Sequence, residues 1–129
     1  MFRRTFIRSL LGMSAFLPLT RPARATRAAT FLIQQSPLAG FQYYAGESLW
    51  SQLRAGDALQ LVRESTNPYD PRAVRVDWRG QKLGYVPRLE NTAVAQMLDR
   101  GEPLAARIER LRDDTNPWER IRFTISVIV

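Results

Sequence analysis

Residues 73–86, AVRVDWRGQKLGYV, decide the fold class because they read as a β-hairpin. Val74, Val76 and Trp78 alternate with polar residues, which is the two-residue period of a strand with one buried face. The Arg-Gly-Gln-Lys that follows has the composition of a tight turn, and residues 83–86 return as the partner strand. The sequence therefore predicts an antiparallel sheet.

Segments on both sides of this hairpin add further strands. Alternating or β-rich patterns predict strands over residues 40–44, 58–64, 104–111 and 121–129, with a short helical turn over residues 47–53. About six short strands in one small domain close most naturally into a curved antiparallel barrel. The expected class is mainly β.

One segment has a helical pattern instead. Between Arg88 and Arg100, apolar residues recur one turn apart at Leu89, Ala93 and Met97, and we expect these three side chains to face the core. Gly101 follows in a position to cap the helix. The sequence therefore predicts one main helix beside the strands.

The first 25 residues resemble an export signal. Arg3 and Arg4 precede an apolar run over residues 10–19, and the segment ends in small residues around Ala25. This is the order of a basic region, an apolar region and a cleavage site. The apolar run is well short of the ~20 residues that a helix needs to cross a bilayer. We therefore expect cleavage after Ala25, with an uncleaved membrane anchor as the alternative.

The same segment indicates an export route. Residues 3–8, RRTFIR, resemble the twin-arginine pattern, in which two arginines precede a Phe, an apolar residue and a base. By that resemblance we expect a bacterial protein that is exported to the periplasm already folded. The predicted organisation is a signal peptide over residues 1–25, a leader over residues 26–35 and one domain over residues 36–129.

Removal of the signal would change the charge of the chain. The whole sequence has 19 basic and 12 acidic residues, a net charge of +7. Five of the arginines and none of the acids precede the expected cleavage site, so 14 bases and 12 acids remain, a net charge of +2. Bulk charge therefore gives no argument for nucleic-acid binding, and only a local basic patch could support it.

Composition also narrows the chemistry. The chain has no Cys and no His, which excludes disulfides, thiol nucleophiles, Cys/His zinc sites and imidazole bases. No Gly-rich phosphate loop is present, because the single lysine, Lys82, is followed by Leu83 and not by Ser or Thr. We expect a protein without a cofactor or a metal that is not an enzyme.

Two related turns are the candidate binding elements. TNPYD at residues 66–70 returns as TNPWE at residues 115–119, and each places an aromatic residue and an acid after an Asn-Pro turn. Aromatic rings suit single-stranded nucleic acid, because each stacked base contributes ~1–3 kcal/mol. An acid fits such a site only where the ligand presents a donor, such as a sugar hydroxyl. Purely structural hairpin corners account for the same turns, and this alternative stays open.

Three segments in order carry a family resemblance. GFQYY at residues 40–44, LVRESTNPYDPRAVRV at residues 61–76 and GQKLGYVPR at residues 80–88 closely resemble the HIRAN domain, over about residues 38–127. That family has a barrel related to the OB fold and is best known for capturing single-stranded DNA at a free 3′ end. The resemblance implies a small OB-like antiparallel barrel of about six strands and a non-enzymatic module that binds single-stranded DNA or nucleotide 3′ ends.

The resemblance also implies roles for individual residues. Tyr43 and Tyr69 would cradle the terminal base, and Asp70 would accept a hydrogen bond from the 3′ hydroxyl. Asn67 would help to hold the terminal nucleotide. Arg88 would meet a phosphate. The resemblance thereby explains why an acidic residue occurs in a site for an anionic ligand.

Four further residues complete the predicted site, namely Gln42, Thr66, Tyr85 and Trp118. Gln42 stands where the best-known members carry Arg, so a charge-assisted phosphate contact is missing there. Trp118 aligns loosely with an aromatic residue that those members use near the end of the domain. The ATPase and zinc-binding parts of larger HIRAN proteins are absent from this chain.

A second function competes with DNA binding. Gln42 and the low charge of the mature chain favour a periplasmic protein-interaction or scaffold domain that has lost DNA binding. A continuous basic groove through Arg72, Lys82 and Arg88, beside accessible tyrosines of the first turn and of GFQYY, would favour the nucleic-acid hypothesis. Buried tyrosines and scattered bases would favour the scaffold.

Overall fold

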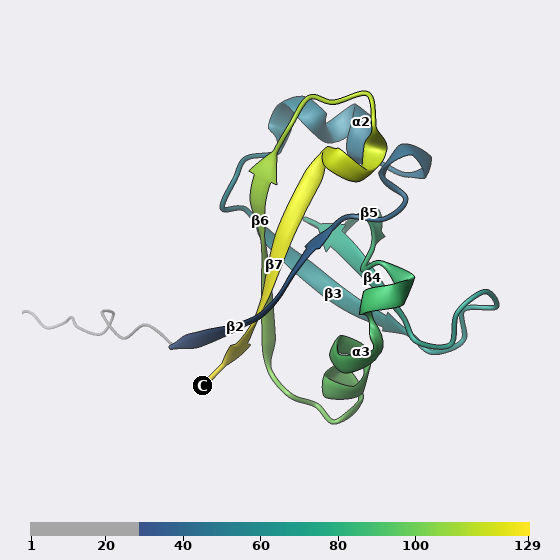
Figure 1. The fold of residues 1–129 in the computed structure, drawn as a ribbon, viewed down its shortest axis with the longest axis vertical. Helices are drawn as coiled ribbons and strands as arrows, with labels where there is room; N and C mark the ends of the chain where they lie inside the picture. Colours follow the sequence, from purple (N-terminus) through teal and green to yellow (C-terminus); the bar gives the residue numbers. More distant parts are fainter. Residues whose placement is uncertain (1–28) are drawn as a thin grey trace, which may run out of the picture.

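Six strands form one antiparallel sheet in the order β2-β7-β6-β3-β4-β5 (Figure 1). The computed structural model describes residues 29–129, so the predicted signal peptide and its cleavage site lie outside the described residues. The strands are β2 (Thr30–Pro37), β3 (Ala58–Glu64), β4 (Ala73–Trp78), β5 (Gln81–Tyr85), β6 (Leu104–Leu111) and β7 (Ile121–Ile128). The helices are α2 (Gly46–Leu49) and α3 (Thr92–Asp99), with 3-10 turns η2 (Phe41–Tyr43), η3 (Trp50–Gln52), η4 (Arg88–Glu90) and η5 (Pro117–Glu119).

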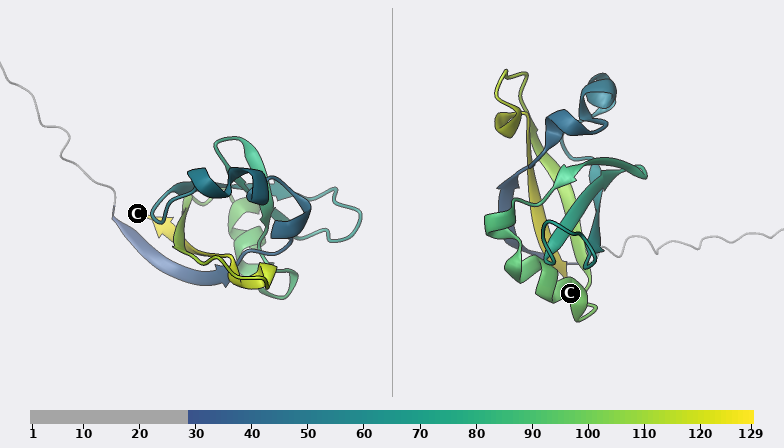
Figure 2. Two further views of the ribbon diagram at one scale, coloured as in Figure 1. Left: turned by 90° about the horizontal axis from the view of Figure 1, so that it is seen from above. Right: turned by 90° about the vertical axis from the view of Figure 1, so that its right-hand side faces the viewer.

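The sheet is strongly curved but does not close into a complete barrel (Figure 2). After β2 ends, Ala39 forms an isolated antiparallel bridge with Tyr85 at the end of β5. Each of the two residues donates its backbone N–H to the carbonyl of the other, at 2.9 Å. The two edges of the sheet therefore meet at one point only. The mainly β class with one main helix is confirmed, and the barrel is an open one.

The predicted hairpin is the centre of this arrangement. Val74, Val76 and Trp78 are at most 2% exposed and belong to the same core cluster as Ile121 and Phe123 on β7. The hairpin loop consists of a residue with φ 47° followed by a glycine with φ 77°, the left-handed geometry of a two-residue turn that matches the twist of the strands. The alternation in the sequence thus identified the strand that carries the core.

The segment GFQYY is not a strand, contrary to the prediction. Gly40 adopts a left-handed conformation with φ 80°, and the next three residues form the 3-10 turn η2. Phe41 is buried in the core, whereas Tyr43 and Tyr44 are 74% and 38% exposed. In a strand with a two-residue period one of these two tyrosines would face the core, whereas in the observed turn neither is buried.

The residues predicted to form the buried face of the helix are also wrong. The chain from Arg88 to Glu90 forms the separate turn η4, and α3 begins only after Asn91. Leu89 is 97% exposed, and α3 buries Val94 and Ala95; Ala93 is exposed and Met97 is half-buried. A 3-10 turn has three residues per turn, so the pattern that begins in η4 does not continue in register into α3.

An additional strand occupies much of the segment predicted as a leader. Thr30–Pro37 forms β2 at the edge of the sheet and pairs with β7, with a register shift between Leu32 and Gln34. Phe31 and Leu32 are adjacent apolar residues, and both are largely exposed. The sequence of this strand therefore shows no alternation of apolar and polar residues. Within residues 29–129, no helix is long and apolar enough to span a bilayer.

Candidate nucleic-acid interface

The turn TNPYD between β3 and β4 is held by one side chain. Asn67 accepts hydrogen bonds at its Oδ1 from the backbone N–H groups of Tyr69, at 2.8 Å, and Asp70, at 3.2 Å. This Asx arrangement and the fixed φ of Pro68 hold the turn in one conformation. Tyr69 points outward and is 84% exposed, so its ring is available to a ligand.

Asp70 points the other way and is only 8% exposed. Its Oδ1 accepts from the backbone N–H of Arg72 at 2.9 Å, and its Oδ2 accepts from Nδ2 of the buried Asn91 at 2.8 Å. Burial raises the pKa of Asp70, but these hydrogen bonds and the charges of Arg88 and Arg72 outweigh it and lower the pKa below its ordinary value. The carboxylate is therefore ionised, and each oxygen retains a lone pair.

A second carboxylate, which the sequence analysis did not single out, lies behind the turn. Glu64 accepts from the Tyr85 hydroxyl at 2.7 Å, from Nδ2 of Asn67 at 3.1 Å and from the Arg75 guanidinium at 3.1 Å. Burial raises the pKa of Glu64, but the hydrogen bonds from Tyr85, Asn67 and Arg75 lower it overall. Glu64 thus ties the turn and β5 to the sheet.

A cation lies between two rings on the other side of the site. Nζ of Lys82 is 4.1 Å from the ring centroid of Tyr44 and 4.6 Å from that of Tyr85. The two rings are 6.0 Å apart and meet at 63°. Burial lowers the pKa of Lys82, but the two tyrosines and Glu64 raise it overall, so the ammonium stays charged at neutral pH.

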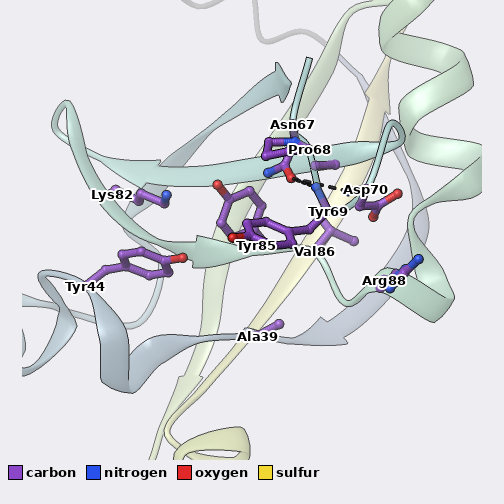
Figure 3. Close-up of a pocket in the computed structure, with 11 residues that line it drawn as sticks. Ala39, Tyr44, Asn67, Pro68, Tyr69, Asp70, Lys82, Tyr85, Val86 and Arg88 are labelled. Carbon is purple, nitrogen blue, oxygen red and sulfur yellow. Dashed lines mark hydrogen bonds between the residues drawn. The ribbon is translucent and has the colours of Figure 1, made fainter. Parts of the chain in front are cut away.

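The first turn and the Lys82 cluster with its two tyrosines line one pocket of about 400 Å³ (Figure 3). This volume is in the range of small-molecule sites. The lining residues are Ala39, Tyr44, Asn67, Pro68, Tyr69, Asp70, Ala73, Lys82, Tyr85, Val86 and Arg88. Five of the nine predicted site residues are among them, and Tyr44 and Lys82 are additions that sequence reasoning had left outside the predicted site.

The other four predicted residues lie outside the pocket lining. Gln42 and Tyr43 are exposed on η2, where the Tyr43 ring meets the Tyr44 ring edge-on at 6.4 Å. Thr66 is exposed at the start of the first turn. Trp118 is 48% exposed on η5, which packs against η2. Tyr43 therefore borders the pocket through Tyr44, whereas Trp118 belongs to a neighbouring surface.

The charges of the site come from both signs. Arg88 lies at the Asp70 end of the pocket, and Lys82 lies at the Tyr44 end (Figure 3). Arg72 is exposed and contributes its backbone N–H to Asp70. Among the described residues, no group of three or more acids is placed to hold a metal ion. The arrangement suits a ligand that combines an anionic group with a hydroxyl donor and an aromatic face.

Comparisons with known proteins agree on the fold. A family model described as HIRAN domain matches residues 32–129. The crystal structure of a protein from Lactobacillus plantarum is 26% identical, with a TM-score of 0.68, and the match covers 79% of this chain and 98% of that chain. The crystal structure of the HIRAN domain of human HLTF is 18% identical, with a TM-score of 0.61, and the match covers 77% of this chain and 78% of that chain. No curated protein matches.

Proposed function

The chain belongs to the HIRAN domain family, and on this premise we propose that it captures the 3′ ends of single-stranded nucleic acid, most readily DNA. HIRAN domains are nucleic-acid-binding modules and are not catalytic by themselves. The proposal concerns the finer point of which part of a nucleic acid this chain binds, and by which residues.

The single observation that carries the proposal is the environment of Asp70. An ionised, nearly buried carboxylate lies in a pocket beside Arg88 and the exposed ring of Tyr69. A carboxylate repels phosphate, so it is useful to a nucleic-acid site only where the ligand donates a hydrogen bond. The terminal 3′ hydroxyl is the donor that a strand end offers and that an internal nucleotide of DNA does not.

The exposed aromatic residues support the same ligand. Tyr69 and Tyr43 are 84% and 74% exposed, although large aromatic side chains contribute most to a fold when they are buried. Tyrosines held outward beside bases are what stacking on a terminal nucleotide requires. They argue against the scaffold alternative, which needs neither the pocket nor a carboxylate in it that can still accept a hydrogen bond.

The test compares strand ends. Fluorescence anisotropy of the purified protein would be measured against short single strands that end in a free 3′ hydroxyl, a 3′ phosphate or a 3′ dideoxy sugar, at two salt concentrations. We expect preference for the free hydroxyl, and affinity that falls with salt because phosphate contacts release counterions. Equal affinity for all three ends would overturn the proposal, and no binding at low salt would leave the scaffold function.

Export to the periplasm is part of the proposal and rests on the sequence of residues 1–25 alone. Fractionation of a bacterial host and mass determination of the recovered protein test it. We expect a periplasmic product that begins at Thr26. Replacement of Arg3 and Arg4 by Lys should retain the protein in the cytoplasm, and periplasmic recovery of that variant would exclude the twin-arginine route.

A further inference from the structure

We propose that Lys82, held between Tyr44 and Tyr85, forms a second subsite of the pocket, which binds the second phosphate from the 3′ end of the strand. This inference rests on the proposed function and extends it from one nucleotide to two. Arg88 and Asp70 would hold the terminal nucleotide, and Lys82 would set the path of the strand that leads away from it.

The position of Lys82 is the first support. Figure 3 places Lys82 and Tyr44 at one end of the pocket and Asp70 and Arg88 at the other, with the Tyr85 ring between them. When one group of a ligand contacts Asp70, the Lys82 end of the pocket therefore remains available to a different part of the same molecule. The Lys82 end is built from two elements, since Lys82 lies on β5 and Tyr44 follows η2.

The charges provide the second support. Arg63, Arg75, Arg100, Arg110, Arg112, Arg120 and Arg122 all form ion pairs. Over residues 29–129, neither Lys82 nor Arg88 has a carboxylate within ion-pair distance. The nearby carboxylates of Asp70 and Glu64 already accept hydrogen bonds from protein donors. Arg54, Arg72, Arg79 and Arg107 form no ion pair among these residues either, but of the unpaired bases only Lys82 and Arg88 line the pocket. Two charged groups at opposite ends of one pocket are thus placed to meet the two phosphates of a strand.

The aromatic contacts decide the kind of ligand group. The Lys82 ammonium lies over both rings, at 4.1 Å and 4.6 Å from their centroids. It therefore occupies ring faces on which a base would otherwise stack. An ammonium carries three N–H donors and no acceptor, and a lysine binds phosphate as a point charge. Tyr44 and Tyr85 hold the charge in place, and the group that it binds is a phosphate.

The experiment uses strands with one neutral linkage. Hexathymidylates would carry a single methylphosphonate at the first, second or third linkage from a free 3′ end, and each would be titrated against the full chain by competition anisotropy. The variants are Lys82→Gln, Lys82→Arg, and Arg107→Gln as a control that removes an equal charge from the exposed side of β6. Melting temperatures of all variants would be measured in parallel.

A phosphate contact predicts a specific coupling. A neutral second linkage should weaken binding by the wild-type protein about ten-fold, the size of one charged hydrogen bond. Lys82→Gln should weaken binding of the unmodified strand by a similar factor and should then be insensitive to the neutral second linkage. Lys82→Arg should restore the sensitivity, and Arg107→Gln should leave it unchanged.

Two failures would be distinguishable. If Lys82→Gln weakens every strand by the same factor, Lys82 acts only by packing on Tyr44, and the second subsite is wrong while end capture stands. If the unmodified strand binds without regard to its 3′ end, the proposed function fails and this inference fails with it. Coupling at the first or third linkage in place of the second would equally overturn the assignment.

Discussion

The two Asn-Pro turns share a sequence pattern and a backbone cap, yet they place their acids in opposite environments. Oδ1 of Asn116 accepts from the backbone N–H of Trp118 at 3.1 Å, as Asn67 does for Tyr69 at 2.8 Å. Asp70 in the first turn points inward and is fixed by neutral donors. Glu119 in the second turn points outward, half-exposed, to two arginines.

This difference shows how one turn can serve two purposes. Arg110 and Arg112 lie 3.6 Å and 3.3 Å from Glu119, so its charge is already balanced by the protein. Asp70 lies in a pocket whose cations, Lys82 and Arg88, are in no ion pair within the described part of the chain. Under the proposed function, the first turn binds the ligand and the second is a structural corner.

The largest expected effect separates the two aromatic residues. Tyr69→Ala should reduce affinity for a free 3′ end by about 10- to 100-fold, which corresponds to the loss of ~1–3 kcal/mol of stacking. Because Tyr69 is 84% exposed, the melting temperature should hardly change. The measurement is anisotropy together with thermal denaturation.

Trp118→Ala is the matched control. Trp118 is 48% exposed, so we expect a moderate loss of stability and little loss of affinity. If Trp118→Ala reduces affinity as much as Tyr69→Ala does, the second turn belongs to the binding site, and the comparison between the turns fails.

The next effect separates the two acids. Asp70→Asn should weaken binding of a 3′-hydroxyl strand by about ten-fold and should not weaken binding of a 3′-phosphate strand, because the phosphate loses a repelling charge. The new amide oxygen can still accept from the backbone N–H of Arg72. Asn91 has a buried Oδ1 without a partner, and rotation of its side-chain amide would let this oxygen accept from the new amide nitrogen. The fold should therefore persist.

Glu119→Gln should leave affinity for both strand ends unchanged, because that carboxylate is bound by arginines outside the pocket. Equal losses of Asp70→Asn for both strand ends would exclude recognition of the terminal hydroxyl. A large effect of Glu119→Gln would again join the two turns in one site.

Regular patterns explain which parts of this fold could be predicted. The strands β4 and β6 begin and end where the sequence places them, because apolar and polar residues alternate along the middle of each strand. The turn η2 and the junction of η4 with α3 could not be predicted, since Gly40 and Asn91 interrupt the period on which the prediction depends. The edge strand β2 has exposed apolar residues and no alternation.

The site divides along a similar line. The motif around Asn67 and Asp70 is local, and its hydrogen bonds span two or three residues. The partners that complete it are distant: Tyr85 reaches Glu64, and Asn91 reaches Asp70, each across 21 residues. Only the folded sheet brings these pairs together, so sequence reasoning found the turn and missed what supports it.

The third effect concerns the two caps. Asn67→Ala removes acceptors for two backbone N–H groups and a donor to Glu64, and we expect a loss of about 1–2 kcal/mol in the free energy of unfolding. Asn116→Ala removes the acceptor of one backbone N–H, that of Trp118. It should lower the free energy of unfolding by about 0.5–1 kcal/mol. Urea denaturation measures both, and a reversed order would show that the first turn is not the more constrained one.

The smallest effect is the dependence of stability on pH. Folding lowers the pKa of Asp70 below its ordinary value of 3.8, so the folded state binds fewer protons than the unfolded state between the two values. The resulting stabilisation is present above pH 3.8 and is lost as the pH falls through the lowered pKa.

Urea denaturation of the wild-type protein and of Asp70→Asn, from pH 6 downward, isolates this contribution because Glu64 titrates in both. The difference between their unfolding free energies should be constant down to about pH 5 and should then narrow in acid. A difference that stays constant to the lowest accessible pH would mean that the fold does not favour the ionised carboxylate, and the contrast between Asp70 and Glu119 would lose its electrostatic basis.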